Sequence, residues 1–483
     1  MKTRSWFSIH SFTGVMTGLL LFIICWSGTF AVLSYEIDWL ITPEMRIEAT
    51  GERASWGTLF DAVQAAYPDG EVTGINKPVD ADKAHSALQA YVSLPDNNSV
   101  TVRVDPYTAE VQSPHSGFNV GRFFRDFHTH LFSLGLSQLG YGSRFGSYLI
   151  QFFGLIMLVS LISALYFYKN WWTRFFDFKW ARSGRAFWSQ FHKLGGVWSI
   201  WFLLIISLTG AWYLYETGQK DLTGGALNYA GTASFAEVVV PPPSSDPSEP
   251  ALPLDTLVAK AKQAFPKLEI NTVSYQWYTD HEGTVYIEGQ TDFPMVRDRA
   301  NQIWLDERSG EVLLQHSASD MPAYWIWSNM ADPLHFGYFG GLASKIIWFI
   351  FGLVVCGLIL SGTYLHVRRL ARKAGGDTNR YRWSGSSAAI IVTLLIMFIA
   401  VPYGFVEQLR GYIPAVDSLE QTPVMTTGVK SVIIGWTALT VSIIIGWVYM
   451  LWKPEKFAKS KKRKQRVDSK KKREVPLELL DTT

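Results

Sequence analysis

The chain has 483 residues, of which 48% are hydrophobic and 15% aromatic, and its formal net charge is +3. Its content of Trp, Tyr and Phe is high for a soluble protein and typical of a protein that meets a membrane interface, and nothing in this balance indicates a nucleic-acid partner. The sequence lacks Walker, HExxH and GxSxG motifs, so ATP-driven transport, zinc proteolysis and serine hydrolysis have no support.

Six apolar stretches are long enough to cross a bilayer as α-helices, which takes about 20 residues each. They cover about 11–35, 145–168, 194–215, 343–366, 387–409 and 431–452. Lys2 and Arg4 precede the first stretch, as in a signal peptide, but its apolar part is too long and no clear small-residue cleavage site follows. We therefore expect residues 1–36 to be the first retained span of an α-helical integral membrane protein.

Basic residues concentrate in the segments 169–193 and 367–386 and in the tail, 453–483. Short loops rich in Lys and Arg stay on the cytoplasmic side of a membrane. Six spans then place both termini in the cytoplasm and the two long acidic segments, 43–120 and 217–332, in the periplasm. The basic tail chiefly sets this topology, and contact with anionic membrane lipid is a second role for it.

An internal repeat relates the stretch that starts at His10 to the stretch that starts at His192. In both, glycines follow the histidine by four and by eighteen positions, and the stretch ends in Tyr-Glu. These glycines are Gly14, Gly28, Gly196 and Gly210. Three matching spacings indicate two copies of one unit, in which an outgoing span leads to an external domain and a return span. The copies have outgoing spans in 1–36 and 194–216 and return spans in 121–168 and 333–366, which makes a four-helix core.

Each external segment is predicted to be a small α+β domain. The stretches "WGTLFDAVQAAYP" and "LDTLVAKAKQAFP" have apolar residues at helical spacing, and alternating, strand-like runs follow both. The segments "DPYTAEV" and "DERSGEV" each predict a tight hairpin. We expect each domain to be a helix packed on an antiparallel sheet, with "PPPSSDPSEP" as a stiff linker before the second domain. The last two spans, 387–409 and 431–452, are not repeated, and we expect them to serve packing or partner docking.

Six histidines lie at the edges of the predicted spans. The cytoplasmic edge has His10, His192 and His366, and the external edge has His128, His130 and His335. One such histidine alone is usually an interfacial anchor, but ionisable side chains in a bundle also face its interior or a partner. Because the two copies are related by duplication, we expect each copy to contribute one imidazole at each edge.

Two imidazoles that face each other across a bundle can bind the iron of a planar haem from both sides. At the external edge we favour His130 with His335, because a glycine follows both by five positions. At the cytoplasmic edge, His192 pairs with His366 as readily as with His10. The repeated glycines leave room either for a flat macrocycle or for close helix packing. Covalent haem attachment is excluded because the chain has no CxxCH motif.

Several motifs resemble those of the PepSY-associated transmembrane helix family over about residues 5–370. They are "FSIHSFTG", "FHKLGG", "SGTF", "LTGAW", "FHTHLFSLG", "PLHFGYFGG" and the two Asp-to-Glu-Val hairpins. Within this family the architecture looks like that of FoxB-type dihaem ferric-siderophore reductases of the bacterial inner membrane. The resemblance implies two PepSY-like periplasmic domains, two haems of type b and an enzyme that reduces siderophore-bound iron at the periplasmic face.

The resemblance also implies roles for particular residues. His130 and His335 would ligate the outer haem iron, and two of His10, His192 and His366 the inner one, with no other catalytic side chain. Five side chains would contact the ferric siderophore: Arg122, Arg125, Tyr324, Trp325 and Trp327. No nucleotide or flavin motif is present, so a quinol, a soluble reduced flavin or a separate reductase must supply electrons from outside the chain.

Two other classes of function remain open at this point. The external domains can serve as a non-catalytic module that binds a peptide or a periplasmic protein, with the spans as anchors. A siderophore or metal permease is the second alternative, although the predicted spans lack carboxylates in their interior, where transporters commonly hold them. A haem absorption band would distinguish the redox protein from the binding module.

Overall fold

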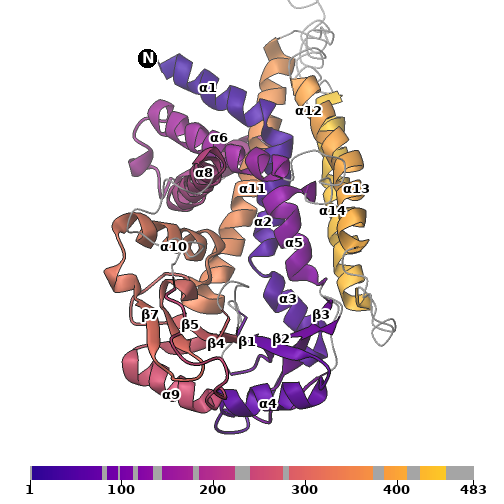
Figure 1. Ribbon diagram of the computed structural model, residues 1–483. Helices are drawn as coiled ribbons and strands as arrows, with labels where there is room; N and C mark the ends of the chain where they lie inside the picture. Colours follow the sequence, from indigo (N-terminus) through magenta and orange to yellow (C-terminus); the bar gives the residue numbers. More distant parts are fainter. Residues whose placement is uncertain are drawn as a thin grey trace, which may run out of the picture.

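The computed structural model describes residues 3–78, 84–95, 98–112, 118–133, 144–177, 184–223, 240–275, 282–373, 386–410 and 425–452. A helical part and a β-sheet part lie at opposite ends of the molecule (Figure 1). The basic tail, most of the basic segment 367–386, His115 and His281 lie outside the described residues. Among the described residues, five helices are long and apolar enough to cross a membrane, and a bent helix pair makes a sixth candidate.

The sheet part is one seven-stranded antiparallel sheet with strand order β3-β2-β1-β4-β5-β6-β7. The strands are β1 (Glu71–Asn76), β2 (Leu88–Leu94), β3 (Asn98–Val104), β4 (Glu269–Tyr275), β5 (Thr284–Gln290), β6 (Gln302–Asp306) and β7 (Val312–His316). The first copy supplies β1 to β3 and the second supplies β4 to β7. They join where Ile75 of β1 pairs with Val273 of β4. The expectation of a separate sheet in each domain is therefore wrong, because the two inner edge strands satisfy each other's backbone groups.

The two predicted domain helices are α4 (Trp56–Ala66) and α9 (Leu254–Ala264), side by side on the sheet face remote from the spans (Figure 1). Leu59 and Val63 of α4 lie at helical spacing, and with Leu257 of α9 they are buried against strand residues such as Ile75. Each fully buried aliphatic side chain contributes about 1.5–3 kcal/mol. The Asp255 carboxylate accepts hydrogen bonds from Ser55 Oγ and from the backbone N–H of Gly57, which links the two copies a second time.

Both predicted hairpin turns are present with matching geometry. The backbone N–H of Ala109 donates to Asp105 O at 2.9 Å, and that of Gly310 donates to Asp306 O at 2.9 Å. Ala109 and Gly310 both adopt the left-handed conformation, with φ of 57° and 69°. After the first turn the returning chain makes only an isolated bridge between Val104 and Val111, whereas after the second it forms β7.

The candidate spans overlap the predicted ones, but the first and third predicted spans, 11–35 and 194–215, each include a break between two helices. The helices are α6 (Phe145–Phe167), α8 (Ile200–Thr223), α11 (Gly341–Lys373), α12 (Ser386–Leu395), α13 (Val401–Arg410) and α14 (Thr427–Trp452), with a π-helical turn over Ile396–Ala400 between α12 and α13. The first span is broken into α1 (Thr3–Met16) and α2 (Gly18–Ala31), which meet at an angle of 69°. In the second copy α7 (Gly184–Trp198) likewise ends before α8. The breaks fall at Thr17 and Ser199, each seven positions after the histidine of its copy.

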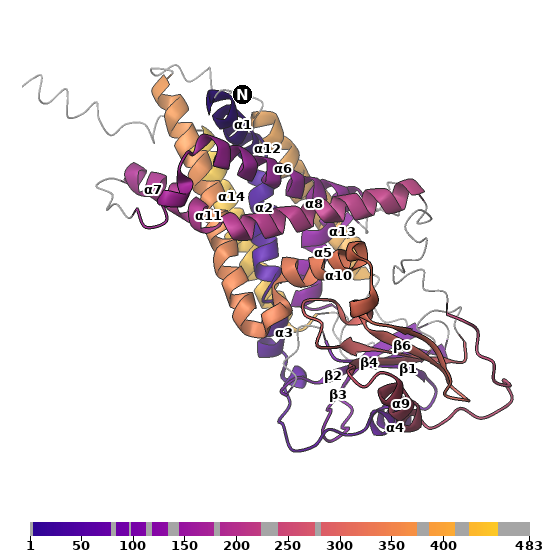
Figure 2. The same ribbon diagram turned by 90° about the vertical axis from the view of Figure 1, so that its left-hand side faces the viewer.

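Short helices connect the spans to the sheet and carry several of the histidines. They are α3 (Ser34–Ile41), α5 (Val120–His130) and α10 (Ala323–Phe336), with 3₁₀ turns η1 (Pro43–Met45), η7 (Asp298–Ala300), η8 (Ala318–Asp320) and η9 (Tyr338–Gly340). A further 3₁₀ turn, η4 (Trp171–Thr173), lies between α6 and α7. Figures 1 and 2 show α6 and α8 side by side, running across the direction of α2 and α11. The unrepeated helices α12 to α14 pack on α2, α5 and α11 through aromatic side chains such as Phe405 and Trp436.

Candidate functional site

Two cavities lie within the helical part. The proximal cavity, nearer the sheet, has a volume of 380 Å³ and includes His128 and His335 in its lining. The distal cavity, of 530 Å³, includes His10, His192 and His366. The repeat therefore distributes its edge histidines over two separate spaces, as the sequence predicts for two edges.

The cavities meet at a shared layer of apolar side chains. Four residues line both: Leu21, Met157, Leu203 and Val355. They come from α2, α6, α8 and α11, one from each helix, and these helices include the two spans of each copy. The layer is apolar, so it offers no polar partner to a water molecule between the two cavities.

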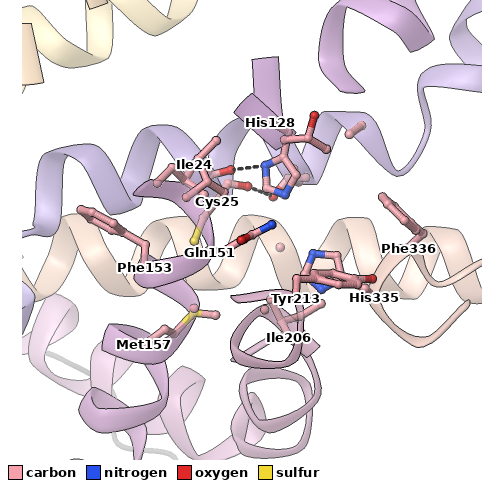
Figure 3. Close-up of a pocket in the computed structure, with 18 of the residues that line it drawn as sticks. Ile24, Cys25, His128, Gln151, Phe153, Met157, Ile206, Tyr213, His335 and Phe336 are labelled. Carbon is pink, nitrogen blue, oxygen red and sulfur yellow. Dashed lines mark hydrogen bonds between the residues drawn. The ribbon is translucent and has the colours of Figure 1, made fainter. Parts of the chain in front are cut away.

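His128 and His335 face each other in the proximal cavity, with ring centres 6.2 Å apart (Figure 3). His128 comes from the last turn of α5 and His335 from the last turn of α10. In the distal cavity His10 of α1 and His192 of α7 have ring centres 6.3 Å apart. Each copy thus contributes one imidazole to each pair, which confirms the expected pairing by duplication.

Each of these four imidazoles contacts a carbonyl or hydroxyl group of a core helix, and the contact recurs with similar geometry. His128 Nδ1 lies 3.0 Å from Ile24 O (Figure 3), and the Ser27 hydroxyl donates to the same carbonyl. His192 Nδ1 lies 3.1 Å from Leu358 O, to which Ser361 Oγ donates. The hydroxyls of Ser27 and Ser361 also lie within 3.2 Å and 3.0 Å of the ring nitrogens. In each case the hydroxyl is three residues beyond the carbonyl.

The same spacing recurs on the other two core helices. His10 Nδ1 lies 3.0 Å from Ser160 O, which also accepts from the Ser163 hydroxyl. His335 Nδ1 lies 2.7 Å from Thr209 Oγ1, and Thr209 donates to the carbonyls of Ile205 and Ile206. The hydroxyl hydrogen of Thr209 is therefore engaged, so its oxygen accepts from His335. Ser27, Ser163 and Thr209 are all fully buried, so these contacts are internal to the helical part.

These acceptors fix which nitrogen of each imidazole carries the proton. A carbonyl can only accept, so His10, His128 and His192 donate through Nδ1–H and keep the Nε2 lone pair free. Thr209 has the same effect on His335. Metal-ligating histidines in proteins are oriented in this way, by donating their other ring N–H to a carbonyl or a carboxylate.

His366 has the opposite arrangement. The Arg369 guanidinium, which can only donate, lies 2.8 Å from His366 Nδ1, and Ser11 Oγ lies 2.9 Å from it. Neutral His366 therefore carries its proton on Nε2, which leaves that nitrogen without a lone pair for a metal. Of the three cytoplasmic-edge candidates, His10 and His192 form the facing pair, and His366 lies in the same cavity with a different contact set.

The expected pairing of His130 with His335 is wrong. Two residues apart on a helix, His128 and His130 point to different faces of α5. His130 lies against the Asp126 carboxylate at 3.5 Å, where Arg122 and Gln408 also bind, and its side chain is 9% exposed. Gly135, which guided the choice of His130, lies outside the described residues.

Of the five side chains expected to contact a substrate, Arg125 alone lines the proximal cavity. Arg122 instead forms an ion pair with Asp126 at 2.6 Å. Tyr324 donates to Gln219 and packs with Trp327 against Trp212, while Trp325 is 5% exposed. Tyr324 and Trp327 therefore secure α10 against α8, and none of the three aromatic residues lines the cavity.

The sequence contained an unused signal for the residues that hold the histidines. Ser27 and Thr209 each lie seventeen positions after the first histidine of their copy and directly before a repeated glycine. The rim of the proximal cavity was also missed: it has Glu216, Arg297 and Asp332, with Arg297 and Asp332 paired at 2.8 Å and Tyr213 donating to Asp332. These residues come from separate segments with no spacing in common.

The sequence left open whether the glycines of the repeat leave room for a flat macrocycle or allow close helix packing. The structure has open space at two of them and close packing at a third. A Cβ added at Gly14 or Gly196 would meet nothing within 4 Å, and both residues line the distal cavity. At Gly210, in contrast, the backbone of Gly154 lies 3.2 Å from such a Cβ, so α6 and α8 pack closely there. A Cβ at Gly28 would lie 2.6 Å from the His128 ring.

The paired imidazoles fit a planar metal cofactor better than a bare metal ion. With metal–nitrogen bonds of about 2 Å and roughly 1.1 Å from nitrogen to ring centre, two imidazoles on opposite sides of one metal have centres about 6 Å apart. The observed 6.2 and 6.3 Å match this. Within the described residues, no three His, Cys, Asp or Glu side chains gather to hold an ion by themselves. A haem would supply the remaining four nitrogens, and Gly14 and Gly196 leave open space in the lining of the distal cavity.

Comparison with known proteins gives the family. The chain is 25% identical to uncharacterized protein PA4219 of Pseudomonas aeruginosa over 283 residues, which are 55% of this chain and 71% of that protein. A family model described as "PepSY-associated TM region" matches residues 7–369, the part that holds the repeat, both cavities and the sheet. The chain therefore belongs to the family of PepSY-associated transmembrane regions.

Proposed function

We propose that this protein is a haem b oxidoreductase of the bacterial inner membrane, which carries electrons across the membrane and reduces siderophore-bound iron at the periplasmic face. The observation that carries the proposal is the presence of two facing imidazole pairs in adjoining cavities. Both termini would lie in the cytoplasm and the sheet in the periplasm, in accord with the basic segments 169–193 and 367–386.

His128 and His335 would hold the outer haem, and His10 and His192 the inner one. A haem at each place would supply one-electron transfer through its iron. The core-helix carbonyls and hydroxyls keep each Nε2 unprotonated and each ring oriented. The layer of Leu21, Met157, Leu203 and Val355 separates the two places by side chains only and keeps water out of that layer.

The substrate would approach the proximal cavity from the sheet side. Its lining includes the cationic Arg125 and Arg297 and the anionic Glu216, which can bind groups of either charge on a polar chelate. One electron converts the bound Fe(III) to Fe(II), which hard oxygen ligands hold far less well, so the iron leaves and the siderophore ligand remains chemically unchanged. A cytoplasmic reductant or a membrane quinol, as the electron donor, is oxidised by one electron for each iron reduced.

The test is an anaerobic oxidation experiment with the purified protein. The protein is reduced with dithionite, freed of excess reductant and mixed with ferric siderophores in the presence of a chelator that absorbs when it binds Fe(II). The proposal expects haem oxidation and Fe(II) formation in equal amounts, and loss of both in His335→Ala. A reduced protein that stays reduced with every ferric chelate would contradict the substrate, and one with no haem would favour a peptide- or protein-binding role.

A further inference from the structure

The distal cavity has a cationic rim. Its lining includes Arg185, Lys193 and Arg369, and its described lining residues include no Asp or Glu. The proximal cavity differs, since there Glu216 and Asp332 accompany the two arginines. Basic residues near a membrane edge also set topology, so the rim by itself does not indicate a ligand.

Arg369 is held in a fixed position at this rim. Its guanidinium donates to Ser11 Oγ at 2.7 Å and to His366 Nδ1 at 2.8 Å, and it lies over the ring of Phe7 at 4.6 Å. These neighbours are uncharged when His366 is neutral. Within the described part of the chain, Arg369 contacts no carboxylate.

Among the described residues, the positive charge of Arg369 therefore has no carboxylate to neutralise it. A half-buried guanidinium without a counter-ion loses hydration that neutral hydrogen bonds replace only in part. Guanidinium groups bind carboxylates through paired, charge-assisted hydrogen bonds, and these are stronger than neutral ones. Arg369 is oriented by neutral neighbours at the rim of the cavity that holds the His10–His192 pair. This arrangement is suited to binding an anionic ligand.

We propose that Arg369, with Arg185 and Lys193, binds the carboxylates of the ligand of the distal cavity. This inference rests on the proposed function, under which those carboxylates are the two propionates of the inner haem. His366 is then a positioning residue, which orients Arg369 and does not bind the iron. Arg369, Arg185 and Lys193 would then hold the carboxylates, while His10 and His192 would hold the iron.

The test compares haem with its dimethyl ester, in which the carboxylates are neutral. The variant His128→Ala/His335→Ala leaves the distal cavity as the haem site, and the protein is produced in haem-starved cells and titrated with each compound in detergent. We expect the affinity for haem to be at least about tenfold higher than for the ester, because one charge-assisted hydrogen bond contributes a difference of that size. Arg369→Gln should remove this preference. Arg368→Gln should keep it, because Arg368 binds Tyr364 and is not part of the cavity lining.

Equal affinity for haem and ester would overturn the inference while leaving haem binding intact. If Arg369→Gln fails to fold, the comparison of haem with ester on His128→Ala/His335→Ala with Arg369 intact still tests the inference, because only the distal site remains. A protein that binds neither compound would refute the proposed function, and this inference with it. A preference for haem that survives Arg369→Gln would also overturn the assignment to Arg369.

Discussion

His128 and His335 lie with ring centres 6.2 Å apart, although they belong to different copies of the repeat and to different short helices. The proximity depends on the core helices, since Ile24 and Ser27 of α2 hold one ring and Thr209 of α8 holds the other. Each outer imidazole is therefore oriented by the outgoing span of its own copy.

The first prediction separates His128 from its neighbour His130. His128→Ala should reduce the haem content by about half, because it would remove one of the two imidazoles proposed to hold the outer haem. His130→Ala should retain the full content, since His130 contacts Asp126. Haem per protein, measured as the pyridine complex, gives the answer, and the reverse pattern would restore His130 as the ligand.

The second prediction concerns the tautomer of His335. Thr209→Val keeps the shape of the side chain but removes the acceptor for Nδ1–H, which lies 2.7 Å away. Loss of such a contact typically weakens metal binding about 10- to 100-fold. Outer-haem affinity should therefore fall and its reduction potential rise, because the imidazole becomes a weaker donor. Thr209→Ser should behave as the parent, and a Val variant with parental affinity and potential would contradict the orienting role.

The third prediction concerns the distal cavity. His10→Ala and His192→Ala should each lose the inner haem, whereas His366→Ala should keep it with a lowered affinity, because Nδ1 of His366 accepts from Arg369. The measurement is haem stoichiometry at saturating haem, followed by a dilution series. Retention of the inner haem in His10→Ala, with its loss in His366→Ala, would identify His192 and His366 as the ligands.

The fourth prediction uses the glycine next to the outer pair. A Cβ at Gly28 would lie 2.6 Å from the His128 ring, so Gly28→Ala should displace that ring and lower outer-haem occupancy at least several-fold. Gly435→Ala on α14 is the matched control, since its Cβ would meet nothing within 4 Å. Equal low-spin absorbance in the two variants would show that the ring of His128 has freedom to move.

The fifth prediction concerns the stability of the sheet. Burial raises the pKa of Glu288 on β5 to about 7, against hydrogen bonds from Tyr286 and Thr272 that lower it. The folded state then holds a proton that the unfolded chain releases above about pH 4.5. Stability from this group is complete below pH 4.5 and is lost as the pH rises through 7, by up to about 3 kcal/mol.

Glu288→Gln should remove that loss and stabilise the sheet at pH 8. Hydrogen exchange of β5 and β6 amides, corrected for the intrinsic effect of pH, measures the difference. The exposed Glu71 provides the control, as Glu71→Gln should leave the pH dependence unchanged. Identical pH profiles for the parent and Glu288→Gln would show that Glu288 ionises normally.

Local patterns in the sequence were sufficient for much of the fold. Helical spacing predicted α4 and α9, and the Asp-to-Glu-Val segments predicted both turns, because short-range contacts determine these elements. Strand β1 was not predicted, since "EVTGIN" includes a glycine and has few apolar residues. Its pairing with β4 depends on a partner almost two hundred residues away, so the continuous sheet had no local signal.

The site was predicted to the level of paired histidines but not to the right residue at the outer edge. Duplication implied one imidazole per copy and per edge, and the structure has that arrangement. The choice between His128 and His130 depends on the rotation of α5, which buried contacts such as Phe124 with Trp436 determine. The bend at Thr17 was likewise hidden, because the apolar run continues through it.

The most direct measurement is the haem content of the purified full-length protein, with its dithionite-reduced minus oxidised spectrum in detergent. Two imidazole pairs in two cavities predict about two haems of type b per chain, both low-spin because two imidazoles would hold each iron. A protein without a Soret band, produced with an adequate haem supply, would contradict the central claim and leave the sheet as the functional part.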